Sequence, residues 1–315
     1  MSLNFSPHLR VFVSIVLSQL NTLLYSSHLF PAAVSFPASR KRLRSATEED
    51  DQAAKHKEIG GNAPDVLQTR CVAIHEAIKA MPDNLDLSNP STFTTLPFPS
   101  LFLMPSQRFE KKVINGIDHF EYMGRSHFHE LQRLIESKEF LSKSESLYLY
   151  GTSGSGKSHL LAALVYHLVR KGKRVFYIPD CSTLHLGPTE QILNALQFAF
   201  YDEAALGNTG DSHDVDAFIR SISQRRDLYI IVDQVNALEI AENDGRKAPT
   251  RQAINWLNAL RLNHPTRYIF SASANENSNR EADRKQSRIS VFRIFGGMSK
   301  VRYLHVIPHN THALY

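Results

Sequence analysis

One eight-residue pattern, at residues 151–158, constrains this chain more than any other feature of its sequence. It reads Gly-Thr-Ser-Gly-Ser-Gly-Lys-Ser and fits G-x-x-x-x-G-K-[ST] at every fixed position. A β-prone run at residues 146–150 precedes it, and an amphipathic segment at residues 157–171 follows it. A glycine-serine turn can match the pattern by chance, but these flanks favour a strand, a phosphate-binding loop and a helix in succession.

The residue types in this loop suit the phosphates of a nucleoside triphosphate. Glycine lets the backbone come close, and backbone N–H groups together with the helix N-terminus surround the negative charge. Lys157 is expected to reach the β- and γ-phosphates, and the Ser158 hydroxyl to ligate Mg²⁺. The predicted nucleotide-binding residues are Gly151, Thr152, Ser153, Gly154, Ser155, Gly156, Lys157 and Ser158.

Strand-like and helix-like segments alternate downstream of the loop. Residues 174–178, 228–232, 268–273 and 289–295 have the composition of strands, and helical periodicity separates them. Such alternation predicts an α/β fold of the P-loop NTPase kind, a parallel sheet flanked by helices. In such sheets ligands bind at the carboxyl ends of the strands. Three further helices are expected, capped by Thr189 and Thr250 and running from Asp214 to about Arg226.

The apolar run at residues 228–232 ends in Asp233 and Gln234. An Asp that ends a strand is common, but one placed downstream of a phosphate-binding loop is expected to hold Mg²⁺ or its water shell. Asp233 is therefore the predicted second metal ligand beside Ser158. Lys157, Asp233 and Gln234 form the predicted catalytic set.

Gln234 occupies the position where many ATPases carry a catalytic Glu. An amide cannot accept the proton of the attacking water, although it can orient that water. We therefore expect slow hydrolysis, unless Glu239 or Glu242 substitutes for the missing carboxylate.

Polar residues also follow the predicted strand at residues 268–273. Ser273 and Asn275 are candidates for sensing the γ-phosphate or placing the water, with a plain polar turn as the alternative. Asn275 is included in the predicted nucleotide site.

A second segment upstream of the loop is also a candidate. Gly124 and Arg125 end a hydrophobic-hydrophobic-Gly-Arg sequence before a predicted helix. Several P-loop families carry such a segment near the adenine, so Gly124 and Arg125 join the predicted nucleotide site.

The base is predicted to be adenine, since the chain lacks an Asn-Lys-x-Asp motif for reading guanine. The cofactors are therefore expected to be ATP and Mg²⁺. The sequence does not single out an arginine finger. Its candidates are Arg220, Arg225, Arg226, Arg251, Arg261 and Arg280.

Composition favours a folded chain with a hydrophobic core. Of the 315 residues, 42% are hydrophobic and 21% are charged. The net charge of +5 suits an anionic ligand and permits nucleic-acid contact without requiring it. Cys71 and Cys181 match no metal or redox spacing, which favours a reducing compartment.

The N-terminal residues bear on localisation. Residues 11–25 are apolar but too short for a membrane span, and they read as a secretory signal or as an untidy extension. The basic cluster at residues 40–44 reads as a nuclear import signal or as solvated linker. We expect an intracellular protein, cytoplasmic or nuclear, with secretion as the alternative.

Composition also divides the chain into four parts. Residues 66–80 are predicted to be helical, and residues 82–107, rich in Pro, Ser, Thr and Phe, are predicted to be loop. The parts are a disordered or targeting extension at 1–65, a partly helical linker at 66–107, a P-loop NTPase domain at 108–298 and a short tail at 299–315.

Five segments carry a family resemblance. They are residues 147–161, 177–181, 231–238, 269–275 and 295–297. Together they resemble the P-loop ATPase module of Crinkler-type proteins, which is related to the ATPases of retrotransposon hot spots. Only the phosphate-binding loop is sharply specific within this resemblance.

The resemblance implies an AAA-like or STAND-like ATPase module over residues 108–298. It implies phosphate and Mg²⁺ ligation by Lys157 and Ser158, with Asp233 as the acidic partner, and the Asp-Gln pair also fits the family pattern. Such proteins usually join the module to an effector domain and carry a ubiquitin-like header. This chain ends soon after Gly297 and has no clear header, which predicts a truncated or divergent member.

Three functional hypotheses follow. The first is an ATP-binding, Mg²⁺-dependent switch or slow ATP hydrolase, acting with a protein partner or as a homo-oligomer. The second is an inactive nucleotide-binding interaction module, and the third is a nucleic-acid-linked ATPase of a mobile element. No membrane span is expected in any of them.

Overall fold

The computed structural model describes most of the chain beyond residue 63. The described residues are 64–102, 104–105, 108–142, 146–152, 154–203, 212–225, 227–238, 247–264, 267–272 and 289–294. The predicted N-terminal signals at residues 11–25 and 40–44, and the tail at residues 299–315, lie outside these ranges.

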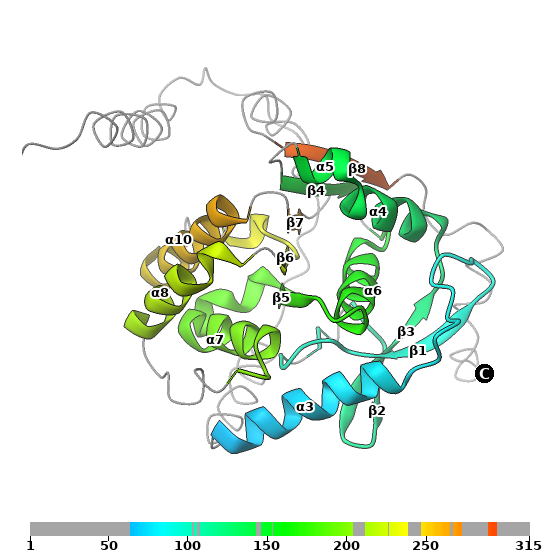
Figure 1. Cartoon of the computed structure of the whole chain (residues 1–315), viewed down its shortest axis with the longest axis horizontal. Coiled ribbons are helices and arrows are strands. Elements are labelled where there is room, and N and C mark those ends of the chain that lie inside the picture. The colour runs from blue at the N-terminus through cyan, green and yellow to red at the C-terminus, as the bar shows by residue number, and fades with distance from the viewer. Residues whose placement is uncertain are drawn as a thin grey trace, which may run out of the picture. The chain divides into compact units, whose positions relative to one another are not determined.

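A five-stranded parallel sheet lies at the centre of the fold (Figure 1). Its strand order is β5-β6-β7-β4-β8, and every neighbouring pair is parallel. β7 thus lies between β4, which leads into the phosphate-binding loop, and β6, which ends before Asp233. The strands are β4 Ser146–Gly151, β5 Arg174–Ile178, β6 Leu228–Val232, β7 Tyr268–Ser271 and β8 Ile289–Ile294.

The sheet confirms the predicted fold class. β5 and β6 occupy the predicted residues, and β4 extends the prediction by Gly151. β7 ends at Ser271 and β8 at Ile294, slightly before the predicted ends. Parallel strands need a crossover between them, which explains the helix that intervenes between β4 and β5.

Side chains of the central strands alternate between two hydrophobic cores, one on each face of the sheet. Leu147 and Leu149 of β4 lie in the first core, whereas Tyr148 lies in the second. In β6, Ile231 belongs to the first core and Ile230 to the second. Because successive strand side chains point to opposite faces, this pattern shows a sheet covered on both sides.

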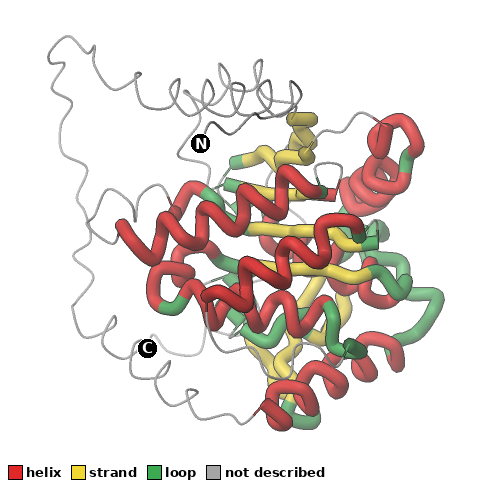
Figure 2. The backbone as a smooth tube through the Cα atoms, turned by 60° about the vertical axis from the view of Figure 1, so that its left-hand side comes forward, coloured by secondary structure: helices red, strands yellow, loops and turns green. Residues whose placement is uncertain are grey.

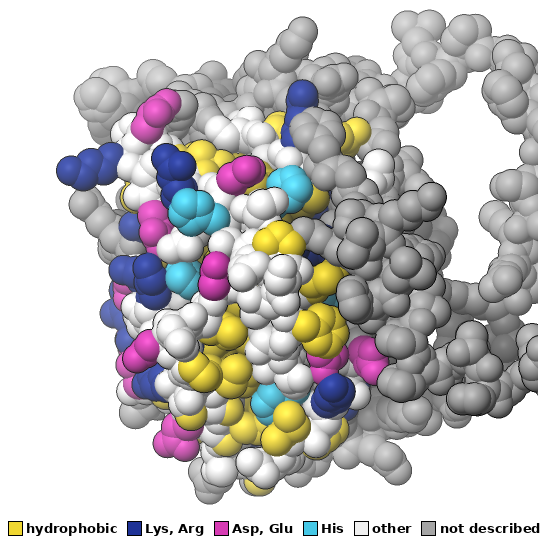
Figure 3. Space-filling model, turned by 90° about the vertical axis from the view of Figure 1, so that its right-hand side faces the viewer, with side chains coloured by type: hydrophobic (Ala, Val, Ile, Leu, Met, Phe, Trp, Pro, Cys, Tyr) yellow, Lys and Arg dark blue, Asp and Glu magenta, His cyan; other side chains and the backbone are white. Residues whose placement is uncertain are grey.

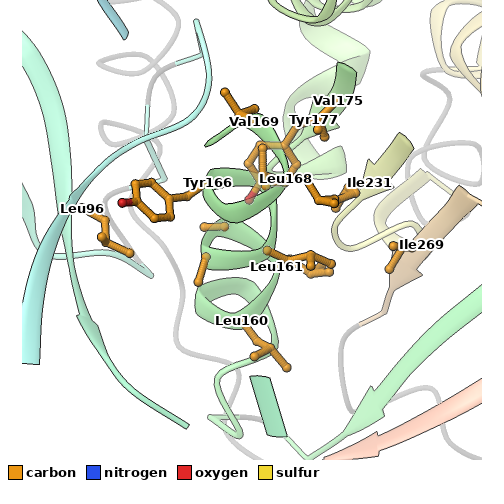
Figure 4. Packing of buried hydrophobic residues seen from close by; sticks show 14 of the residues in the cluster. Leu96, Leu160, Leu161, Tyr166, Leu168, Val169, Val175, Tyr177, Ile231 and Ile269 are labelled. Atoms are coloured by element: carbon orange, nitrogen blue, oxygen red, sulfur yellow. The ribbon is translucent and has the colours of Figure 1, made fainter. Parts of the chain in front are cut away.

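The first core is built around α6, Lys157–Arg170. Its apolar residues are buried on all sides, including Leu161, which lies on the sheet side with Ile231 and Ile269 (Figure 4). Tyr166 lies on the other side of the helix, towards Leu96 (Figure 4). Each fully buried side chain of this size contributes roughly 1.5–3 kcal/mol, so the helix that carries the loop is firmly held.

The second core lies under three helices. In Figure 2, turned to bring this side forward, helices lie in front of the strands. Two predicted caps are wrong. Pro188 starts α7 and Gly187 is its N-cap, because proline suits a first helical position, so Thr189 lies inside the helix. Thr250 lies within α10 and is fully buried. The helices are α7 Pro188–Ala199, α8 Ser212–Ser221 and α10 Lys247–Asn263.

Two short 3-10 segments accompany these helices. η1, Cys181–Leu186, follows β5, and η3, Ile222–Gln224, follows α8. α8 therefore ends at Ser221 and does not continue as a regular helix to Arg226 as predicted.

A small antiparallel sheet with strand order β1-β3-β2 packs near α6 (Figure 1). Its first strand corrects the loop predicted for residues 82–107, since β1, Phe93–Pro97, pairs with β3, Ile117–Met123. Pro97 obscured the strand in the sequence, but an edge strand tolerates proline. Burial of Leu96 fixes the strand on the first core.

β2 and β3 form a hairpin that the sequence analysis missed. β2, Lys111–Ile114, pairs with β3 across a turn at Asn115 and Gly116. Both turn residues have positive φ, 51° and 76°. Asn-Gly is the usual sequence of such a two-residue turn, so the signal was present in the chain.

The segment before β1 packs on the sheet domain. α3, Pro64–Ala80, confirms the predicted helix. The imidazole of His75 stacks on the Tyr201 ring at 3.7 Å between centroids. Arg170 of α6 donates to the carbonyls of Met81 and Pro82, each at 2.6 Å. The described residues between 64 and 105 therefore form part of the packed structure, while the predicted domain boundaries stay predictions.

Two further helices lie between β3 and β4 in the chain. α4, Ser126–Glu136, follows Arg125 and buries Phe128, Leu131 and Ile135. α5, Lys138–Ser142, buries Phe140. α4 confirms the helix predicted after Gly124 and Arg125.

Candidate phosphate-binding site

The loop between β4 and α6 has the backbone that a phosphate cradle requires. Gly154 and Gly156 have positive φ of 72° and 81°, a region in which a side chain is costly. Gly151 ends β4, and the hydroxyl of Ser155 is buried without a hydrogen-bond partner among the described residues. Ser153 lies outside the described residues.

Lys157 folds back over the loop. Its Nζ donates to the carbonyl of Gly151 at 2.7 Å and to the carbonyl of Thr152 at 3.0 Å. The residue is 9% exposed. Burial lowers the pKa of Lys157, while the negative charge of Asp233 raises it. The lysine thus places a positive charge at the mouth of the loop, where the sequence predicts phosphate.

Asp233 and Ser158 meet at the carboxyl end of the sheet. Ser158 lies close enough to the Asp233 carboxylate to lower its pKa. Asp233 is 1% exposed, and its Oδ2 has no hydrogen-bond partner among the described residues. Burial raises the pKa of Asp233, and the neighbouring Ser158 and Ser271 oppose that rise.

These oxygens fit a magnesium ion. Mg²⁺ prefers oxygen ligands and is usually held by one or two carboxylates together with substrate phosphates. A hydroxyl beside a buried carboxylate oxygen that lacks a hydrogen bond provides that donor set. Within the described ranges, no three His, Cys, Asp or Glu side chains gather into a metal site of their own.

Gln234 follows Asp233 with a left-handed backbone, at φ 59°. Its N–H lies 3.5 Å from Oγ of Ser271, and the next N–H, of Val235, donates to the Ser271 carbonyl at 3.0 Å. These contacts fix the backbone of Gln234 beside the end of β7. Glu239 and Glu242, the predicted substitutes, lie outside the described residues.

The residue of β7 that reaches Asp233 is Ser271, whose hydroxyl donates to Asp233 Oδ1. Ser273 and Asn275, the candidates from the sequence, lie outside the described residues, so their roles stay predictions. Ser271 was overlooked because it was assigned to the strand itself. Its position at the end of a strand next to β6 was the signal that could have identified it.

Arg125 lies against the loop, and Gly124 directly precedes it. Nη1 of Arg125 donates to the Ser155 carbonyl at 2.7 Å. A Cβ on Gly156 would lie 2.2 Å from the same guanidinium, so the missing side chain makes room for Arg125. A Cβ on Gly124 would lie 2.0 Å from the Asn89 carbonyl oxygen. Their predicted role near the adenine stays a prediction.

Arg108 and Asp180 also belong to this edge of the sheet, although the sequence analysis assigned neither a role. Nη2 of Arg108 lies 2.9 Å from Asp180 Oδ2, and Nη1 lies 3.6 Å from Asp233 Oδ2. Asp180 follows β5, which neighbours β6 in the sheet. Arg108 and its two acidic partners lie far apart in the sequence. Their ion pairs therefore leave no local sequence pattern and can be seen only in the fold.

The parallel sheet, the loop and the acidic strand end define a P-loop NTPase fold. Residues 108–187 match the sequence family described as IstB-like ATP binding protein. No curated protein matches the chain significantly. Within the described residues, no helix has the length and apolar character needed to cross a membrane.

Several solved structures match part of the chain. A DNA replication initiation factor and AMPPCP-bound DnaA from Aquifex aeolicus are each 17% identical to the chain, with TM-scores of 0.33 over 57% of it. PCH-2 of C. elegans is 17% identical, with a TM-score of 0.30 over 54%. The chain spans about half the length of these structures: 47%, 48% and 41%.

Proposed function

We propose that this protein binds ATP with Mg²⁺ and works as a nucleotide-dependent switch or slow ATP hydrolase. The observation that carries the proposal is the proximity of Ser158, at the start of α6, to the buried carboxylate of Asp233, whose pKa Ser158 lowers. It joins the two predicted metal ligands, which are far apart in the sequence. Lys157 lies directly before Ser158, so cationic and metal-binding groups converge on one small region.

Each residue of the site has a separate task in this proposal. The loop backbone and Lys157 would hold the phosphates, and Ser158 and Asp233 would hold the metal. The metal would neutralise negative charge on the bound phosphates when present. Gln234 would orient the attacking water without accepting its proton, which is why we propose slow turnover.

An inactive nucleotide-binding module is the second candidate, and Gln234 is the observation that favours it. A residue that only orients water contributes less to hydrolysis than one that also takes the proton. From the sequence resemblance, we further propose that the chain is a Crinkler-type protein. In that case it would act beside an effector or partner protein.

A nucleic-acid-linked ATPase is the third candidate, supported by the net charge of +5. On the face shown in Figure 3, basic and acidic side chains are interspersed. That mixture gives no preference for a polyanion on this face. Binding to DNA that falls steeply with added salt would favour this candidate, and no binding at low salt would exclude it.

The decisive experiment is calorimetry with Mg²⁺ and ATP on the wild type and on Lys157→Ala. We expect binding by the wild type and a loss of at least about tenfold in affinity in the variant, because a charge-assisted contact to phosphate is removed. Lys173→Ala, which removes an exposed lysine just after α6, is the control and should bind as the wild type does.

Two further measurements complete this test. Thermal unfolding establishes that Lys157→Ala is folded, since the lysine also hydrogen-bonds two loop carbonyls. Phosphate release that depends on Lys157 would favour the hydrolase over the inactive module. A folded wild type that binds no ATP would refute the proposal.

A further inference from the structure

Arg108 belongs neither to the phosphate-binding loop nor to the central sheet. Its side chain nevertheless contacts carboxylates that follow two strands of that sheet. Its guanidinium lies within ion-pair distance of both Asp180 and Asp233, at 2.9 and 3.6 Å. Nη1 also lies 3.3 Å from the carbonyl of Pro179, to which it donates a hydrogen bond. The charged head of this residue is therefore placed beside the carboxylate that also contacts Ser158.

Asp180, which holds the Arg108 guanidinium, is itself fixed in place. Oδ1 of Asp180 accepts a hydrogen bond from the N–H of Ser182 at 2.9 Å and so caps η1. The backbone on either side is tied to Asp233, since Cys181 donates to its carbonyl and its N–H donates to Ile178. Asp180 cannot shift without moving the end of β6, so it holds Arg108 in a defined place.

The backbone of Arg108 is fixed as well. The next residue, Phe109, is 2% exposed and packs on the rings of Phe98, Phe120 and His159. His159 follows Ser158 in α6, so this aromatic contact links Arg108 to the helix of the loop. A side chain supported at both ends is pre-organised for a ligand, and exposed surface pairs usually lack such support.

The two ion pairs of Arg108 differ in kind. The 2.9 Å contact with Asp180 has hydrogen-bond length, whereas the 3.6 Å contact with Asp233 is too long for one. Asp180 therefore holds the guanidinium, and Asp233 only attracts it. A guanidinium carries five N–H donors in a fork that matches phosphate oxygens, so one anchored arginine can also bind phosphate.

We propose that Arg108 is a phosphate-binding residue, which recognises the terminal phosphate of a nucleoside triphosphate and so distinguishes triphosphate from diphosphate. This inference rests on the proposed function, because it requires nucleotide on the loop. Lys157 and the loop backbone bind phosphate from the α6 side, and Arg108 adds a cation at Asp233. The arginine acts within its own chain and needs no neighbouring subunit.

The test compares affinities for Mg²⁺ with AMPPCP and for Mg²⁺ with ADP, measured by calorimetry. Arg108→Ala should bind AMPPCP at least about tenfold more weakly and ADP within about twofold of the wild type. Arg108→Lys should recover part of the AMPPCP affinity, because it keeps the charge but lacks the planar fork.

Arg174→Ala is the matched control. Its side chain is 18% exposed against 19% for Arg108, and it pairs with Asp202 and Glu203 away from the loop. It should leave the ratio of the two affinities unchanged. Equal losses of AMPPCP and ADP in Arg108→Ala would show a structural clamp and overturn the inference, as would no loss of either.

A second variant covers the case in which Arg108→Ala does not fold. Asp180→Asn keeps Arg108 and weakens its anchor, so it should show the same selective loss to a smaller extent. Unchanged affinity for both ligands in a folded Asp180→Asn would overturn the inference. A folded wild type that binds neither ligand would instead refute the proposed function, and the inference with it.

Discussion

Ser271, the last residue of β7, donates a hydrogen bond from Oγ to Oδ1 of Asp233, which follows β6. Two neighbouring strands thus end in a hydroxyl and a carboxylate that contact each other. Asp233 is almost fully buried, and a buried carboxylate is costly unless hydrogen bonds stabilise it. The relationship explains how this fold keeps a carboxylate inside the protein.

Replacement of Ser271 by alanine should therefore destabilise the protein. We expect the free energy of unfolding to fall by about 1–3 kcal/mol, the usual cost of removing one partner from a buried acceptor. Urea denaturation at pH 7 measures the change. Ser221→Ala is the control, because it removes an exposed hydroxyl that bonds only to a backbone carbonyl. Equal effects of the two substitutions would contradict the role given to Ser271.

A comparison of Gly156→Ala with Gly172→Ala should separate the cost of backbone strain from the effect of the Arg125 contact. A Cβ at Gly156 meets both a positive φ of 81° and the Arg125 guanidinium at 2.2 Å. A Cβ at Gly172 meets only a positive φ of 69°, with no atom within 4 Å. Each substitution should cost about 1–2 kcal/mol of stability, since the guanidinium can move aside.

Nucleotide affinity, measured by calorimetry, should distinguish the two glycine variants. Gly156→Ala displaces Arg125 from the Ser155 carbonyl and should weaken ATP binding by at least about tenfold, whereas Gly172→Ala should not. Equal affinities of the two variants would mean that Arg125 does not support the loop.

The sequence predicted the central strands and the loop because both have local signals. An apolar run between turns is visible within a few residues, and the loop pattern is contiguous. β1 was missed because Phe93–Pro97 is short, ends in proline and owes its place to pairing with β3. The β2–β3 hairpin was missed although Asn115 and Gly116 gave a recognisable signal.

The candidate site was predictable only in part, for the same reason. Lys157, Ser158 and Asp233 follow from patterns that strands and loops impose. Ser271 and Arg108 depend on which strand neighbours β6 and on where a segment far upstream packs. Strand order and long-range packing are not written in any short stretch of sequence.

The protein should lose stability between about pH 6.5 and pH 4. Burial lowers the pKa of His159 to about 4, and an unfolded histidine has a pKa of about 6.5. Below pH 6.5 the unfolded chain takes up a proton that the folded state refuses, so acid favours unfolding. The slope is at most about 1.4 kcal/mol per pH unit for each such histidine.

His159→Gln removes this titration and should flatten the pH dependence of the free energy of unfolding in that window. Urea denaturation at several pH values gives the slope. His129→Gln, which removes an exposed imidazole from α4, is the control variant. A slope that His159→Gln leaves unchanged would mean that the other histidines whose pKa burial lowers, His75, His167 and His264, account for the effect.

Gln234→Glu should speed hydrolysis. The residue follows Asp233 with a backbone fixed at φ 59°, so a glutamate would start from the same position. A carboxylate can accept the proton of the attacking water, which an amide cannot, and general bases contribute roughly 10²–10⁴-fold. We expect a rise of at least about tenfold in phosphate release at saturating Mg²⁺ and ATP. Gln234→Ala, which removes the amide, should instead lower the rate. If neither substitution changes turnover, Gln234 does not contact the water, and the slow step lies elsewhere.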